Sequence, residues 1–389
     1  MEKLLVFNTV ELCLAGVTFL LFIIQLLYYL VVYTRPLYAA EKTNSPTQSE
    51  LQPVSIIVYA KNAAENLKKY LPSLLSQDYP HYEVIVVNDG SSDETEDILK
   101  LYKNENEHLY HTYIPHDDRY MSRKKLALTL GIKAAKHEIL LFTEANCHPL
   151  SDQWIRCMTQ KYQPGTEIIL GFCAYGNYKG FMQKLIAYDN LRNGLQYISA
   201  ALANHPYTGN GCNLSYSKNL FFQHKDYYKS FSFRANDDDL FINQVATAKN
   251  VQVEYSADSI IEMEKIEQVK NWKETKTSRA ATYQYYRGGQ LFFYQLETIS
   301  FFLFVLVVIA SIAFGISGNW LISVWSILLY LGLFTTKAIV LHKSAKLLQQ
   351  KPITGWLPFL ELIQPLFNLH IRIHCALKKK NDFTMHLGM

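Results

Sequence analysis

The sequence predicts an α/β domain built on a mainly parallel β-sheet, with transmembrane helices on either side of it. Between about residues 53 and 150, short apolar runs alternate with segments of helical spacing. Strands that are apolar throughout and separated by helices are typical of a parallel sheet covered on both faces. Long uncharged apolar stretches lie before and after this region, and 49% of the chain is hydrophobic. The protein is therefore expected to be a membrane-anchored α/β protein.

Two uncharged stretches are long enough to cross a membrane. Residues 12–33 can span a hydrocarbon layer of about 30 Å as a helix. We expect a retained anchor and not a cleaved signal peptide, because the stretch exceeds the roughly 7–15 apolar residues of a signal and does not follow a basic start. Residues 298–336 are about twice the length of one crossing, and the turn-forming residues 315–319 divide them into a helical hairpin.

The charges that flank these stretches predict the orientation. Lys and Arg residues follow the first span, precede the second and follow the third, whereas the hairpin turn has none. The positive-inside rule then places the α/β domain on the cytoplasmic side of a multi-pass protein of the cell inner membrane. The predicted organisation is an N-terminal transmembrane anchor (1–34), a linker (35–52), the α/β domain (53–290), a transmembrane hairpin (298–341), and an interfacial helix with a basic C-terminal tail (352–389).

The elements of the domain follow one another in regular order. We predict strands at 54–59, 83–87, 109–114 and 138–142, and helices at 64–76, 93–102 and 124–136. Ligands of such sheets bind beyond the carboxyl ends of the strands. Two strands end in polar and acidic residues, namely Asn88-Asp89-Gly90-Ser91-Ser92-Asp93 and Glu144-Ala145-Asn146. Asp89-Gly90-Ser91 alone is more typical of a turn with a helix N-cap, but two acidic strand ends at one edge favour a site.

The ordered motifs of residues 53–287 resemble those of the family-2 glycosyltransferases, the inverting, membrane-anchored bacterial type with the Rossmann-like GT-A fold. Residues 54–62 resemble the first strand of that family and its end. Residues 77–80 and 83–93 resemble its most recognisable stretch, and residues 122–131 resemble its basic helix start. The resemblance implies a nucleotide-sugar pocket formed by Ala60, Asn62, Asn88, Asp89, Asp93, Lys124 and Lys125. A solvated helix end is the other interpretation of the two lysines.

The segment Glu144-Ala145-Asn146 lies where the family has its Asp-x-Asp motif. Alternate side chains of an extended segment point to the same side, so Glu144 and Asn146 can share one cation. Their carboxylate and amide oxygens are ligands that Mg²⁺ or Mn²⁺ accepts. Because this pair carries one negative charge fewer than Asp-x-Asp, we expect weaker metal binding.

Two later segments resemble the acceptor loop and the catalytic element of the family. The first contains Gly209, Asn210, Gly211 and Asn213, for which a simple tight turn is the alternative. The second, Asn236-Asp237-Asp238-Asp239-Leu240, places Asp237 at the catalytic position, with Asp238 in reserve because the register is uncertain by one residue. A helix N-terminus rich in Asp is an alternative that does not exclude catalysis.

The resemblance implies an inverting glycosyltransferase that moves a sugar from a nucleotide-sugar, with a UDP-sugar favoured, to an acceptor hydroxyl in cell-envelope glycan or glycolipid synthesis. Its expected partners are the donor, a glycan or lipid-linked acceptor, and membrane lipids. The small net charge of +4 without a basic stripe excludes a nucleic-acid partner. The alternatives are a processive polysaccharide synthase, a polyprenyl-phosphate glycosyltransferase, or a non-catalytic membrane protein with a nucleotide-sugar pocket. The six scattered cysteines lack disulfide or metal-type spacing and fit a reducing compartment.

Overall fold

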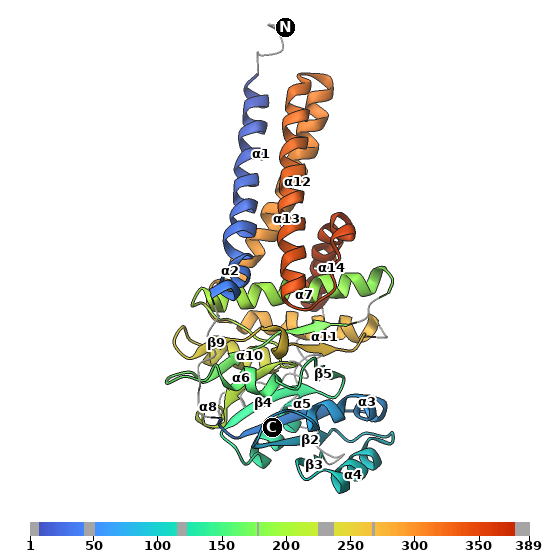
Figure 1. Cartoon of the computed structure of the whole chain (residues 1–389). Helices are drawn as coiled ribbons and strands as arrows, with labels where there is room; N and C mark the ends of the chain where they lie inside the picture. The colour runs from blue at the N-terminus through green and yellow to red at the C-terminus, as the bar shows by residue number, and fades with distance from the viewer. Residues whose placement is uncertain are drawn as a thin grey trace, which may run out of the picture.

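The structure is a computed structural model that describes residues 8–42, 51–114, 123–176, 179–224, 237–266 and 269–377. Figure 1 shows an α/β domain from which three long helices, α1, α12 and α13, project side by side. The sequence predicted this division of the chain. The predicted strands and helices of the first half of the domain all appear close to their expected positions.

A seven-stranded sheet with the order β3-β2-β1-β4-β8-β6-β9 forms the centre of the domain. Its strands are β1 (Val54–Ala60), β2 (Tyr82–Asn88), β3 (Leu109–Tyr113), β4 (Ile139–Glu144), β6 (Ile168–Leu170), β8 (Leu214–Ser217) and β9 (Val251–Val253). β8 alone runs antiparallel to its neighbours, and the other pairs are parallel. A second sheet contains β5 (Cys147–Pro149), β10 (Ile261–Met263) and β7 (Cys173–Tyr175) in that order.

Alternate residues of β1 point to opposite faces of the sheet, as the pleat requires. Ile56 and Val58 belong to an apolar core beneath α3 (Ala64–Leu75) and α4 (Thr95–Glu105), whereas Ile57 belongs to a core beneath α5 (Arg123–Ala134). α5 packs so closely that a Cβ atom at Gly131 would lie 2.6 Å from the side chain of Ile57. Both faces of the parallel strands are therefore covered, which explains their uninterrupted apolar sequences.

The remaining helices of the domain lie between the sheet and the long helices or around the sheet edge. They are α6 (Trp154–Thr159), α7 (Phe181–Leu202), α8 (Lys218–Gln223), α10 (Asp237–Val245) and α11 (Val269–Thr282). α7 and α11 form the layer nearest the long helices (Figure 1). This layer places the ends of the strands and the base of the long helices on opposite sides of α7.

Three helical stretches among the described residues are long and apolar enough to cross a membrane: Thr9–Glu41, Gln290–Ile316 and Trp320–Leu347. The first contains α1 (Thr9–Leu27), a short π-helix (Tyr28–Val32) and α2 (Arg35–Lys42); the others are α12 (Gln290–Ser317) and α13 (Trp320–Leu347). Leu21, Phe304 and Leu333 pack together between them. α14 (Leu357–Leu377) lies beside the base of these helices (Figure 1), with Phe367 stacked on Trp272 of α11.

Buried ion pairs join the α/β domain to the long helices. Arg192 of α7 pairs with Glu297 of α12 and donates a hydrogen bond of 2.9 Å to Gln364 of α14. Lys276 of α11 pairs with Asp189 of α7, which also accepts a hydrogen bond from Gln364. A charge taken out of water needs a partner of this kind, so these pairs hold the domain and the long helices in a fixed arrangement.

Candidate active site

The loops after β1 and β2 are locked to each other. Both contain a residue in the left-handed region, with φ of 45° at Asn62 and 56° at Gly90. The Asn62 backbone N–H donates to Ser91 Oγ at 2.8 Å, and the Ser92 N–H donates to Asn62 Oδ1 at 2.9 Å. Asn and Gly tolerate this conformation better than other residues. The two strand ends therefore form one rigid edge.

Asp89 lies at this edge and is almost completely buried. It accepts a hydrogen bond of 2.7 Å from the hydroxyl of Tyr59, and it pairs with Lys61 at 3.3 Å and with Arg123. Tyr59 is paired in register with Glu144 on β4. Tyr59 thus links the two predicted strand ends: its hydroxyl binds Asp89, and its backbone is paired with Glu144.

The side chains of Asn88 and Asp93 form hydrogen bonds that stabilise the loop after β2. Asn88 donates to Glu96 at 3.0 Å and accepts the N–H of Ser91. Asp93 accepts the N–H of Ala64, the first residue of α3, at 3.1 Å, as well as the N–H and hydroxyl of Thr95. Burial raises the pKa of Asp93, but these hydrogen bonds stabilise its anion and lower the pKa overall.

Glu144 and Lys124 form an ion pair at the end of β4, with 2.6 Å between Lys124 Nζ and Glu144 Oε1. Attraction to Lys124 is the main cause of the lowered pKa of Glu144, and its effect exceeds that of burial, which raises the pKa; Arg279 makes a smaller contribution in the same direction as Lys124. Glu144 is therefore a carboxylate at neutral pH. The structure thus brings together one residue predicted to bind the diphosphate and one predicted to bind the metal.

A cavity of about 1000 Å³ opens beside this ion pair. This volume is at the upper end of the range of small-molecule sites. Its lining comes from the strand ends, the loop before β8, α7, α10 and α11. The predicted site residues among its lining residues are Asn62, Lys124, Glu144, Asn146, Gly209, Asn210 and Gly211.

The other described site residues predicted from the sequence do not line this cavity. They are Ala60, Asn88, Asp89, Asp93, Lys125 and Asn213. Asn213 is fully buried, donates to the carbonyl oxygens of Phe172 and Ser259 at 2.8 Å each, and accepts the indole N–H of Trp154 at 3.1 Å. It therefore fixes the loop from behind, while Gly209 and Asn210 face the cavity.

The first turn of α10 supplies a buried carboxylate on the opposite wall. Asp239 lines the cavity, and its Oδ2 accepts a hydrogen bond of 2.7 Å from the hydroxyl of Tyr286. Arg279 lies nearby and lines the same cavity; burial opposes its charge, but attraction to Asp239 raises its pKa. The Nε of Arg279 is a buried donor without a hydrogen-bond partner among the described residues. The side chains of Asp237 and Asp238 lie outside what the structure describes.

The sequence did not predict Asp239 as a site residue, although Asp239 belongs to the acidic triplet that contains Asp237 and Asp238. Successive residues of a helix are rotated by about 100°, so a register error of one residue changes which carboxylate faces the site. Tyr286 was also not predicted as a site residue. Its role depends on the packing of α10 against the segment after α11, which no local pattern reveals.

Two smaller cavities continue from this wall toward the long helices. One of about 60 Å³ shares Asn193, Asp239 and Arg279 with the large cavity. The next, of about 80 Å³, shares Asn193 and Tyr283 with the first and is lined by Thr298 of α12 and by α14. The three cavities are therefore neighbours, and the one of about 80 Å³ reaches α12 and α14.

Part of the chain is similar in sequence to known glycosyltransferases. Residues 55–221 match the model of the family described as glycosyl transferase family 2. The poly-β-1,6-N-acetyl-D-glucosamine synthase of Staphylococcus epidermidis is 30% identical over 125 residues, which are 32% of this chain and 29% of that protein. Glycosyltransferase AglE of Haloferax volcanii is 35% identical over 109 residues, 28% of this chain and 34% of that protein. The chain thus matches about a third of the length of these relatives.

A solved structure has a similar fold over most of the chain. It is the mannosyltransferase PcManGT of Pyrobaculum calidifontis in complex with GDP-Man and Mn²⁺, with a TM-score of 0.55 and 16% sequence identity. The likeness covers 94% of this chain and 100% of that one. The arrangement of an α/β domain with its helices therefore has a counterpart of known structure, with the GT-A fold that the sequence predicted.

Proposed function

This chain contains a family-2 glycosyltransferase domain, and from that premise we propose that the protein is an inverting glycosyltransferase acting at the cytoplasmic face of a membrane. The observation that carries the proposal is the cavity between Glu144 and Asp239, which opens at the carboxyl ends of the strands and is lined on its other side by α7 and α11, the layer next to the long helices (Figure 1). Its walls combine anionic and cationic groups that suit a nucleoside diphosphate-sugar and a hydroxyl acceptor.

The donor would bind along the strand ends. Asn62 and Lys124 line the cavity there, while Asp89 and Asp93 hold the loops that support them. Lys124 and Arg279 line the same cavity, and a lysine and an arginine together are suited to bind a diphosphate. This chain has Asn88 where the family usually has Asp, and Ala63 where it usually has Glu. Uridine is the proposed base.

Glu144 and Asn146 would hold a divalent cation. Both line the cavity, and both offer the oxygen ligands that Mg²⁺ and Mn²⁺ prefer. Lys124 already occupies one oxygen of Glu144, so the cation would use the other oxygen or displace the lysine. A bound cation would offset charge on the leaving diphosphate.

The proposed reaction is a single displacement. The acceptor hydroxyl attacks the anomeric carbon, its proton passes to a carboxylate at the first turn of α10, and the bond from that carbon to the diphosphate oxygen breaks. Asp237 is the proposed base, because it matches the catalytic position of the family motif. Asp239, held by Tyr286, supports the negative first turn and orients Arg279 toward the leaving diphosphate. Attack from the face opposite the leaving group inverts the configuration.

The acceptor would approach from the membrane side. The neighbouring cavities between Asp239 and α14 contain polar groups, including Asn193, Gln295 and Arg372, next to the helices proposed to span the membrane. This position favours a lipid-linked glycan whose lipid part stays in the bilayer. A processive polysaccharide synthase is the second candidate, supported by the similarity to the Staphylococcus epidermidis synthase.

The test is a donor screen on the purified full-length protein. Nucleotide-sugars with different bases are added with and without Mn²⁺, and thermal unfolding and release of nucleoside diphosphate are measured. We expect one donor to raise the melting temperature in a metal-dependent way and to be consumed when lipid-linked glycan is added. Lack of stabilisation and turnover with every donor would contradict the proposal. Product length then separates single addition from polymerisation.

A further inference from the structure

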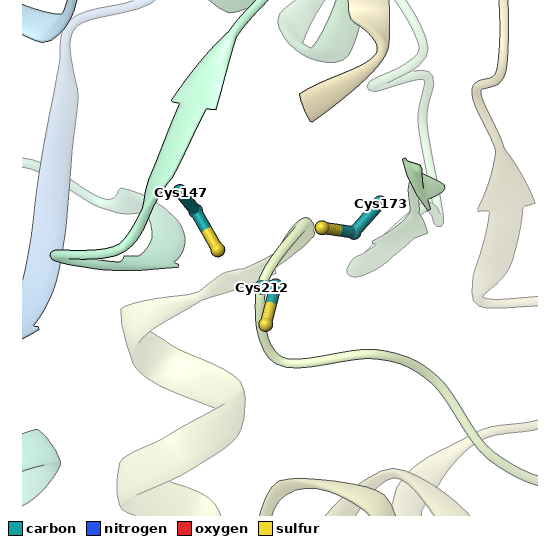
Figure 2. A group of neighbouring side chains, drawn as sticks. All are labelled: Cys147, Cys173 and Cys212. Carbon is teal, nitrogen blue, oxygen red and sulfur yellow. The ribbon is translucent and has the colours of Figure 1, made fainter. Parts of the chain in front are cut away.

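Three cysteines that lie far apart in the sequence converge behind the cavity. Cys147, Cys173 and Cys212 come from three separate segments of chain (Figure 2), and their sulfur atoms all lie within 4.8 Å of one another. Their exposed fractions are 0%, 0% and 6%. Buried cysteines can serve as small apolar side chains, but packing alone does not require three sulfur atoms to share one point.

The backbone around the cluster fixes these positions. Cys147 on β5 and Cys173 on β7 are both held by the strand between them, β10, through the register pairs with Met263 and Ile261. The N–H of Cys212 donates to Asn210 Oδ1 at 3.1 Å, and the next residue, Asn213, is bonded to the carbonyl of Phe172 beside Cys173. The three sulfur atoms are therefore presented together without rearrangement of the chain.

Three convergent cysteine side chains form a site for a soft cation once their thiols lose their protons. Sulfur ligands select Zn²⁺ and Cu⁺ over Mg²⁺ and Mn²⁺, which prefer oxygen. Zinc accepts three protein ligands and leaves a fourth position for water. Cys212 also lines the large cavity, which gives an ion and a water molecule a path from solvent. Three charged groups lie close enough to act on the charge of Cys212: the Glu144 carboxylate opposes a thiolate there, whereas Lys124 and Arg279 offset its negative charge.

We propose that Cys147, Cys173 and Cys212 bind one Zn²⁺ ion, separate from the cation proposed at Glu144 and Asn146. Binding forms three Zn–S bonds and releases the three thiol protons to solvent, with no change of oxidation state. The ion ties the strand that follows Asn146 to the loop that contains Gly209 and Asn210. It is a structural ion that fixes the distance between the two walls of the cavity. The proposal depends on the cysteine geometry and not on the reaction assigned above.

The test uses the purified full-length protein, stripped of metal and kept with a phosphine reductant. Co²⁺ is titrated as a spectroscopic probe, and thiolate-to-cobalt charge-transfer absorption is recorded. We expect saturation at one equivalent, loss of the band when Zn²⁺ is added, and no loss when Mg²⁺ is added. Cys147→Ser, Cys173→Ser and Cys212→Ser should each remove most of the band. Cys157→Ser, a half-buried cysteine outside the cluster, is the matched control and should keep it.

X-ray absorption of the zinc-loaded wild-type protein gives a result that does not depend on how the variants fold. We expect three sulfur neighbours at about 2.3 Å from zinc. A first shell made only of nitrogen and oxygen would overturn the proposal. So would a wild-type protein without the cobalt band, or a band that all three cluster variants retain.

Discussion

The two walls of the cavity are built in different ways. The wall at the strand ends consists of local loops, in which Asn62, Ser91 and Asp93 bond to residues of neighbouring turns. The other wall, called here the helix-side wall, consists of α7, α10, α11 and the segment after α11, joined by side chains that are distant in sequence, such as Asp239 and Tyr286. One wall is therefore held by backbone geometry and the other by buried polar contacts between helices.

This difference implies different sensitivities to mutation. Several hydrogen bonds to backbone N–H groups stabilise the loops at the strand ends together, so the loss of one leaves the others in place. Many of the side chains in these loops are partly solvated. The helix-side wall depends on a few buried charges, each of which leaves a partner unpaired when it is removed. We therefore expect the largest effects on that wall.

Replacement of the proposed base should have the largest effect on activity. Asp237→Asn removes the proton acceptor and should lower the transfer rate by about 10²–10⁴-fold, while donor affinity stays within about threefold because the donor binds mainly at the other wall. Stopped assays with radiolabelled donor and calorimetric donor binding measure the two quantities. Asp97→Asn, on the exposed face of α4, is the control. Wild-type turnover by Asp237→Asn would refute the assignment, and a larger loss in Asp239→Asn would transfer the role to Asp239.

Loss of a buried charge behind the helix-side wall should have the largest effect on stability. Arg192→Met leaves Glu297 buried and unpaired, and we expect a loss of about 3–5 kcal/mol. The double variant Arg192→Met/Glu297→Leu should recover much of it. The matched change at the other wall is Lys68→Met, which breaks exposed pairs with Glu65 and Glu94 and should cost less than about 1 kcal/mol. Thermal unfolding in detergent measures all three, and equal losses at the two walls would contradict the comparison.

The same difference explains how much of the site could be predicted from the sequence. The strand ends were predictable because Asp89-Gly90 and Glu144 directly follow apolar runs, and the register of a parallel sheet brings such ends together. The contacts of Asp239 were not predictable, because they depend on which face of α10 meets Tyr286. The cysteine cluster was missed for a related reason: its members are separated by tens of residues. Cys147 and Cys173 meet through the pairing of β5, β10 and β7, and Cys212 joins them from the loop before β8.

Mutations of the Glu144–Lys124 ion pair, where the two walls meet, should have a smaller effect. The two mutations should change Mn²⁺ affinity in opposite directions. Glu144→Gln removes the carboxylate proposed as a metal ligand and should weaken Mn²⁺ binding by about tenfold, on the order of 1.4 kcal/mol. Lys124→Met frees that carboxylate from its partner at 2.6 Å and should strengthen Mn²⁺ binding. Direct titration with Mn²⁺, followed by electron paramagnetic resonance, measures the affinity without reference to activity. Changes of the same sign in both variants would show that Lys124 and the cation do not compete.

The smallest effect should come from the cap at the strand ends. The hydrogen bonds that lower the pKa of Asp93 stabilise the folded state above the unfolded pKa of about 3.9, and this contribution is lost as the pH falls through the lower folded value. Asp93→Asn should therefore lower stability at pH 7 by about 0.3–1 kcal/mol, and the two proteins should converge as the pH falls below about 4. Melting curves at several pH values test this, and a difference that is independent of pH would exclude a role for the charge.

The central claim is that the strand ends and the acidic turn of α10 face one ligand in one cavity. Hydrogen–deuterium exchange of the full-length protein, with and without the donor identified by the thermal screen, tests it most directly. We predict that donor and Mn²⁺ together slow exchange in residues 60–66, 88–95, 144–147, 209–213 and 237–245. Protection of the strand ends alone, with unchanged exchange in 209–213 and 237–245, would contradict the claim.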